Sequence, residues 1–132
     1  MKFEHFAINT TDARAATRWY VEHLGLRIAR QMVAPPYTAF LADETGRVMI
    51  EIYTRTDAAV LNFPETNPLS FHIAFVSEDN DRMLVKLTAA GAVRGFEDVL
   101  PDGSRLQMMR DPWGVALQFC HRSKPFGAVA AT

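Results

Sequence analysis

The chain lacks most features that mark secreted, membrane-spanning or disulfide-stabilised proteins. Its 132 residues contain one cysteine, Cys120, so no intramolecular disulfide can form and a reducing compartment is expected. No apolar run is long enough to cross a bilayer, and the first residues lack the charged, apolar and small-residue segments of a signal peptide. We therefore expect a cytoplasmic protein that has no membrane partner.

The chain also lacks an excess of either charge. It has 14 basic and 15 acidic residues, a formal net charge of -1, and no long run of one sign. This pattern gives no electrostatic footprint for nucleic acid, so a small molecule is the expected partner. A chain of this length buries about two thirds of its unfolded surface, which is enough for one compact domain with its own core.

What the chain does have is an internal repeat. His5 and His72 are 67 positions apart, and so are Glu51 and Gln118. The flanking residues repeat as well, because 3–12 resembles 70–79 and 47–53 resembles 114–120. Repeats of this kind indicate that one structural unit is used twice.

Apolar periodicity and turn residues predict the same order of elements in both copies, β-α-β-β-β. The first helix is expected to open at Thr11 or Asp12 and to stop at Gly25. We therefore predict an α+β fold in a single domain, 1–132, made of modules 1–53 and 70–121, with linker 54–69 and a loose tail at 123–132. The expected strands are 2–9, 26–32, 37–42, 47–53, 70–76, 93–99, 104–110 and 114–121, and the second expected helix is 79–90.

Strand alternation predicts where the repeated polar residues point. Successive side chains of a strand face opposite sides, so His5 should face away from the side that carries the helix. The same reasoning applied to Glu51, His72 and Gln118 directs all four side chains toward one concavity.

Two histidines, a glutamate and a glutamine inside apolar strands are chemically suited to a divalent metal. Imidazole nitrogens and carboxylate or amide oxygens bind Zn, Ni, Co, Mn or Fe ions. A single histidine or glutamine in a strand is more often a hydrogen-bonded structural residue, but the shared offset favours a site. The sequence thus predicts a metal site at His5, Glu51, His72 and Gln118.

Over nearly its whole length the chain resembles the vicinal oxygen chelate superfamily, which includes glyoxalase I, extradiol dioxygenases, methylmalonyl-CoA epimerase and bleomycin-resistance proteins. The resemblance rests on residues 4–8, 19–26, 71–75 and 111–114. It implies that paired β-α-β-β-β modules form a cup-shaped mixed sheet with helices outside, and that the four residues named above are the metal ligands. In layout the chain is most similar to glyoxalase I.

The chain departs from glyoxalase I in its chemistry. That enzyme has a glutamate at the position of Gln118, where the carboxylate is both a ligand and the base that abstracts a proton, and an amide cannot be that base. Glu51 is then the expected catalytic base. Glutathione use is in doubt because Asn9 stands where bacterial forms carry an arginine, although Arg55 is a candidate substitute. Phe40 and Trp113 are the further expected substrate contacts.

Two functions follow as expectations. The first is a metal-dependent lyase or isomerase of the glyoxalase type that moves a proton next to a carbonyl in a small, oxygen-chelating metabolite. The alternative is a metal-free binding or resistance protein of the bleomycin-resistance type. The resemblance also implies a homodimer, in which His5 and Glu51 of one subunit join His72 and Gln118 of the other.

Overall fold

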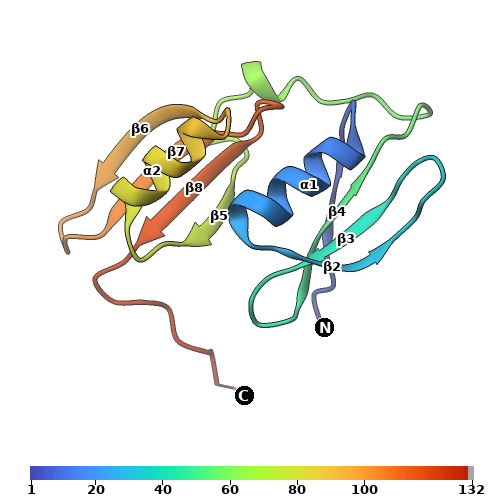
Figure 1. Ribbon diagram of the computed structural model, residues 1–132. Coiled ribbons are helices and arrows are strands. Elements are labelled where there is room, and N and C mark those ends of the chain that lie inside the picture. Colours follow the sequence, from blue (N-terminus) through green and yellow to red (C-terminus); the bar gives the residue numbers. More distant parts are fainter. Residues whose placement is uncertain (131–132) are drawn as a thin grey trace. The chain divides into compact units, whose positions relative to one another are not determined.

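The structure is a computed structural model that describes residues 1–130. The chain divides into two compact units, and the boundary along the sequence lies between Leu61 and Asn62. Each unit is a sheet of four strands with one α-helix against one face (Figure 1). The predicted α+β class and the repeated β-α-β-β-β order are confirmed.

The first unit contains one mixed sheet with strand order β1-β4-β3-β2. Strands β1 and β4 are parallel, and the other neighbours are antiparallel. Its elements are β1 (Phe6–Asn9), α1 (Ala13–Leu24), β2 (Arg27–Gln31), β3 (Ala39–Ala42) and β4 (Val48–Tyr53).

The second unit repeats this plan with strand order β5-β8-β7-β6, and β5 is parallel to β8. A short 3-10 helix, η1, precedes the sheet. Its elements are η1 (Phe63–Glu65), β5 (Ile73–Val76), α2 (Asn80–Ala89), β6 (Val93–Val99), β7 (Arg105–Arg110) and β8 (Ala116–His121).

Both α-helices start with an aspartate cap. The Asp12 carboxylate accepts a hydrogen bond from the Ala15 N–H at 3.0 Å, and the Asp79 carboxylate accepts one from the Arg82 N–H at 2.9 Å. Each bond satisfies an N–H group that has no partner inside the helix. The predicted end of α1 is confirmed, because Gly25 takes the left-handed conformation with φ 72°.

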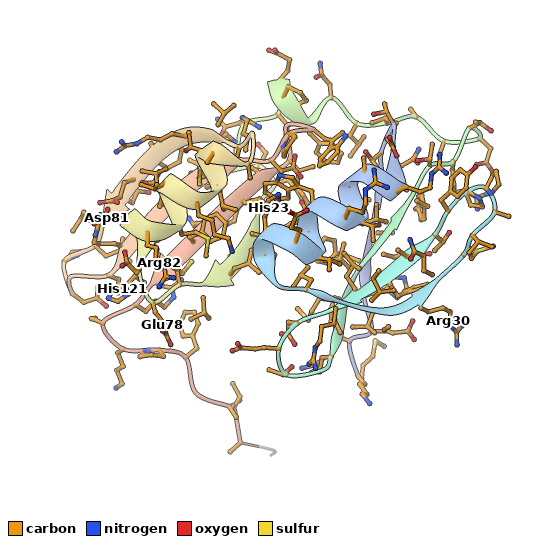
Figure 2. The ribbon with its side chains drawn as sticks, in the orientation of Figure 1. His23, Arg30, Glu78, Asp81, Arg82 and His121 are labelled. Atoms are coloured by element: carbon orange, nitrogen blue, oxygen red, sulfur yellow. The ribbon has the colours of Figure 1, made fainter. Side chains whose placement is uncertain are left out.

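The helices cover apolar strand faces. In the first unit Tyr20 of α1 and Ile50 and Ile52 of β4 are each at most 2% exposed. In the second unit Leu87 of α2 and Leu117 of β8 are fully buried. The exposed side of α2 carries charge, and Figure 2 shows Asp81 and Arg82 near the start of this helix. One face of each sheet therefore packs against a helix and forms the hydrophobic core of its unit.

The first strand of each unit is shorter than predicted. Strand β1 begins at Phe6 and β5 at Ile73, although apolar patterns suggested starts at 2 and 70. The reason is that pairing with β4 and β8 begins only at Phe6 and Ile73. His5 and His72 therefore lie just before a strand and not inside it.

The turn before β8 packs tightly against η1. Gly114 has a positive φ of 86°, and a Cβ at this position would lie 2.4 Å from the Pro64 side chain. No other residue fits here without displacing Pro64. In residues 1–130 neither α-helix is long and apolar enough to cross a membrane.

Candidate functional site

The four predicted ligands occupy matching positions in the two units. Ala7 of β1 is the register partner of Glu51 in β4, and Ala74 of β5 is the register partner of Gln118 in β8. Each histidine lies two residues before that alanine. Each unit thus contributes one histidine with one acid or amide side chain, which we call the first half-site (His5 and Glu51) and the second half-site (His72 and Gln118).

In the first half-site the two side chains are in contact. The His5 Nε2 atom lies 3.1 Å from a Glu51 carboxylate oxygen, and His5 Nδ1 lies 2.9 Å from a carboxylate oxygen of Glu4. The side chains of His5 and Glu51 are 27% and 19% exposed. The Phe40 ring packs against the imidazole with its centroid 5.4 Å away. The pair is accessible from solvent and bordered by an aromatic surface.

The two carboxylates around His5 have a consequence for its protons. A neutral imidazole has one N–H group, so it can donate to only one of two acceptors. Both contacts of His5 are hydrogen bonds only in the imidazolium form. A divalent cation held by Nε2 and the Glu51 carboxylate would take the place of that second proton, while Nδ1–H would still donate to Glu4. Histidines that bind a metal commonly donate their other N–H to a carboxylate in this way. This arrangement fits two ligands of a divalent metal.

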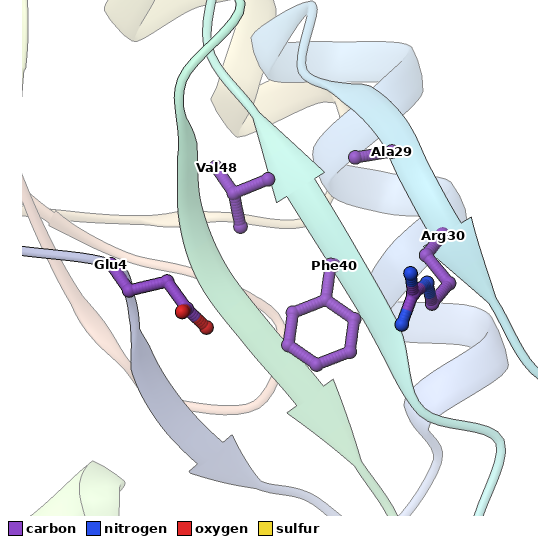
Figure 3. Close-up of a pocket in the computed structure, with 5 residues that line it drawn as sticks. All are labelled: Glu4, Ala29, Arg30, Phe40 and Val48. Atoms are coloured by element: carbon purple, nitrogen blue, oxygen red, sulfur yellow. The ribbon is translucent and has the colours of Figure 1, made fainter.

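A pocket of about 370 Å³ lies beside the first half-site. Figure 3 shows Phe40 between Glu4 and Arg30 on one face of the sheet. The lining residues are Glu4, Ala29, Arg30, Phe40 and Val48. The predicted substrate contact Phe40 is therefore a lining residue, whereas Glu4 and Arg30 were not predicted. The pairing of Arg30 with Phe40 depends on an irregularity in β2 between Ile28 and Arg30, which the sequence does not reveal.

In the second half-site His72 is held by the backbone. Its Nδ1–H donates to the Pro68 carbonyl oxygen at 2.8 Å, which in the neutral ring leaves Nε2 with its lone pair free. Gln118 is 8% exposed, and its Oε1 atom accepts a weak hydrogen bond from the Cys120 thiol at 3.4 Å. Burial raises the pKa of that thiol, so it remains a donor. A free Nε2 and an amide oxygen are both acceptable metal donors.

The loop that carries Pro68 is held by Arg110 of β7, which sequence analysis did not single out. Its guanidinium donates to the carbonyl oxygens of Phe63 at 2.8 Å, Thr66 at 2.7 Å and Gly114 at 3.0 Å. Arg110 thereby holds the segment from Phe63 to Thr66, which leads directly into Pro68, the residue whose carbonyl accepts from His72. Its targets are main-chain atoms, so no side-chain pattern could have pointed to it.

The other predicted substrate contacts already have partners within their own units. The Asn9 amide donates to the carbonyls of Arg55 and Ala58 at 3.1 and 2.9 Å, and its oxygen accepts from the Arg55 N–H at 2.8 Å. The Arg55 guanidinium pairs with Asp57, and this contact raises the pKa of Arg55 and lowers that of Asp57. Trp113 is half-buried in the turn before β8, where its main-chain N–H donates to the Asp111 carboxylate at 2.9 Å. Their substrate roles stay predictions.

Neither half-site is a complete metal centre by itself. In residues 1–130 no three His, Cys, Asp or Glu side chains come close enough to hold a metal ion. Each half-site supplies two donors, and one of the four is an amide. The donor set of two imidazoles, one carboxylate and one amide suits a divalent transition metal.

Comparison with known proteins identifies the family of the chain. Residues 2–119 match the profile of the Glyoxalase/Bleomycin resistance protein/Dioxygenase superfamily. No curated protein sequence is similar enough to the chain to count as a relative.

Solved structures share the fold at low sequence identity. A glyoxalase-related enzyme from Fulvimarina pelagi has 20% identity and a TM-score of 0.70, with 96% of this chain and 93% of that chain covered. A glyoxalase family protein from Enterococcus faecalis has 24% identity and a TM-score of 0.67, with 91% and 97% covered. Lactoylglutathione lyase from Agrobacterium tumefaciens has 18% identity and a TM-score of 0.64, with 90% and 92% covered.

Proposed function

Because the chain belongs to the glyoxalase, bleomycin resistance protein and dioxygenase superfamily, we propose that it is a metal-dependent lyase or isomerase of the glyoxalase type. Members of this superfamily often bind divalent metals and are often enzymes. The observation that supports the proposal is the first half-site, where His5 Nε2 and a Glu51 oxygen lie 3.1 Å apart beside an open pocket.

In this proposal His5, Glu51, His72 and Gln118 hold one divalent cation, supplied by one chain or by two. The bound cation provides positive charge that polarises two neighbouring substrate oxygens. Glu51 is the only carboxylate of the four, so it takes the proton from the carbon next to the carbonyl and returns it to the adjacent carbon. Glu4 keeps the Nδ1 proton of His5 in place, and Pro68 does the same for His72.

Gln118 sets the limit of the proposed activity. An amide does not accept a proton from carbon, so the second half-site offers no second carboxylate base. We therefore expect little turnover of the hemithioacetal of methylglyoxal and glutathione. Substrates that need one base are favoured, which includes small α-hydroxy-carbonyl compounds.

The proposal is tested by metal binding to the tag-free protein. Titration calorimetry with Zn²⁺ should show a site that His5→Ala and His72→Ala each empty while circular dichroism shows an unchanged fold. His121→Ala is the matched control, because His121 is exposed and its Nδ1–H donates to the Ser77 carbonyl oxygen at 3.1 Å, outside both half-sites. Loss of stability without any change in bound metal would assign both histidines to a structural role.

A second candidate function is metal-free binding of a small molecule, as in a resistance protein. The observation in its favour is Gln118, whose oxygen already contacts the Cys120 thiol and carries no charge to attract a cation. Elemental analysis separates the two functions. Protein that holds no metal even after incubation with Zn²⁺, Ni²⁺ or Co²⁺, yet binds small organic ligands, would establish this alternative.

We further propose that the protein is a homodimer. Strands β2 and β6 each pair on one side only, and every residue of β2 is exposed. Open strand edges of this kind are commonly covered by a partner. Light scattering after gel filtration tests the proposal, and a monomer at micromolar concentration that still binds metal would contradict it.

A further inference from the structure

Arg30 is the positively charged residue that lines the pocket of the first unit. Among residues 1–130 its side chain has no ion-pair partner. Two other arginines of this unit have polar partners. Arg27, on the same strand, donates to the carbonyl oxygens of Asp43 and Glu44 at 3.2 and 3.0 Å, and Arg55 pairs with Asp57. The Arg30 guanidinium is therefore available to a ligand.

The acidic residue of the same pocket does not neutralise it. The Glu4 carboxylate is engaged by His5 Nδ1 at 2.9 Å, and Figure 3 places Glu4 and Arg30 on opposite sides of the Phe40 ring. The pocket thus has a free cation at one end, an aromatic face in the middle and a carboxylate that belongs to His5 at the other end.

Strand register connects Arg30 to the first half-site. Arg30 is the cross-strand partner of Phe40, and Phe40 is the cross-strand partner of Glu51. The Phe40 ring also contacts the His5 ring. A ligand that reaches from Arg30 across Phe40 therefore ends beside His5 and Glu51.

We propose that this pocket binds a small organic monocarboxylic acid, with its carboxylate on Arg30 and its apolar or planar part on Phe40. A guanidinium pairs with a carboxylate through two parallel hydrogen bonds. The volume of about 370 Å³ suits a ligand of this size. A doubly charged phosphate is disfavoured by the Glu4 and Glu51 carboxylates. The proposal rests on the proposed function, in that it assigns the substrate class of the same site.

Benzoate and its neutral analogue benzamide are suitable probes. Titration of the full, ¹⁵N-labelled protein in EDTA, followed by amide chemical shifts, should show that benzoate binds near Arg30 and Phe40 and that benzamide binds at least about tenfold more weakly, because it lacks the charge. The chelator removes any metal, so failure of the proposed metal site does not affect this readout.

Two variants complete the test. Arg30→Gln should weaken benzoate binding at least about tenfold and leave the weak binding of benzamide unchanged. Arg47→Gln is the matched control, since Arg47 is an exposed arginine of the same unit outside the pocket lining, and it should have no effect. The proposal is wrong if benzoate does not bind at millimolar concentrations, if both probes bind equally, or if Arg30→Gln binds benzoate as the wild type does.

Discussion

The two units share one backbone plan but use it for different chemistry. In the first unit the repeated backbone frame holds an imidazole beside a carboxylate, His5 and Glu51, and this pair is partly exposed and lies beside a pocket. In the second unit the same positions hold His72 and Gln118, a neutral pair in which the amide is 8% exposed. Matching positions therefore fix where side chains lie, whereas charge and burial decide what they can do.

The units also differ in how their histidines are oriented. His5 lies between two carboxylates on side chains, whereas His72 donates to a main-chain carbonyl in a loop that Arg110 holds. The first half-site is consequently sensitive to charge, and the second half-site is sensitive to loop structure. Substitutions that separate these two sensitivities test the comparison.

The largest effect is expected from Glu51→Gln, which gives the first half-site the same pair of residue types as the second, a histidine and a glutamine. Loss of the only carboxylate ligand should weaken Zn²⁺ binding on the order of 100-fold and remove the proposed base. Calorimetry measures the affinity, and Glu44→Gln, an exposed residue of the turn before β4, supplies the same charge change as a control. Unchanged affinity would mean that the units do not differ in their contribution to metal binding.

Arg110→Gln tests how much the hydrogen bonds of Arg110 to main-chain carbonyls stabilise the second unit. Three main-chain carbonyls lose a charged donor, so the free energy of unfolding should fall by about 2 kcal/mol. Urea unfolding measures this loss. Arg82→Gln, on the exposed side of α2, should change stability little. A variant as stable as the wild type would show that the three hydrogen bonds contribute nothing to the loop.

Gln118→Glu restores a carboxylate to the second unit and so makes the units alike. The added charge should tighten Zn²⁺ binding about tenfold, and without metal the buried carboxylate should lower stability by about 1 kcal/mol. Thermal unfolding in EDTA and in Zn²⁺ should therefore move in opposite directions relative to the wild type. Gln31→Glu, on the exposed strand β2, is the control. Identical shifts in both buffers would contradict a metal role for position 118.

The smallest effect is expected on the surface of the second unit. Arg105 pairs with Asp81 of α2 and Glu97 of β6, and its hydrogen bond and charge lower the pKa of Asp81. A carboxyl whose pKa is lower in the folded state than in the unfolded state stabilises the fold when the pH is above its unfolded-state pKa. This contribution is lost as the pH falls through its folded-state pKa. Asp81→Asn should thus lower the melting temperature slightly at pH 7, and the difference should shrink and then vanish as the pH falls below the ordinary pKa of an aspartate and through the lowered pKa of Asp81. A difference that grows in acid would contradict this assignment.

Much of the fold was readable from the sequence because its signals are local. Asp12, one of the two predicted caps, and Gly25 each act within a few residues of the helix that they bound, and both are found where the pattern placed them. The starts of β1 and β5 were predicted too early, because a strand begins where its hydrogen bonds to the neighbouring strand begin. An apolar pattern does not indicate where that pairing starts. The offset of 67 residues correctly indicated matching register positions in the two sheets.

The surroundings of the site were not readable in the same way. Arg110 acts on carbonyl oxygens that every residue has, so its partners leave no trace in the sequence. Arg30 faces Phe40 because of a register irregularity in β2, which simple alternation does not anticipate. Asn9, predicted as a substrate contact, has its amide engaged by residues 55 and 58, since a side chain near a strand end can bond the returning chain.

The hydrogen bonds of Asn9 and Arg110 attach the two ends of the expected linker 54–69 to the first and the second unit, respectively. The Asn9 side chain donates a hydrogen bond to the Ala58 carbonyl, and the Arg110 side chain donates one to the Phe63 carbonyl. Between them residues 59–61 have no regular structure, and Val60 and Leu61 are exposed. Extra residues between Val60 and Leu61 would break no hydrogen bond of Asn9 or Arg110, and lengthening a loop carries only a small entropic cost. We therefore expect the protein to fold normally with a peptide tag or a second domain inserted between Val60 and Leu61.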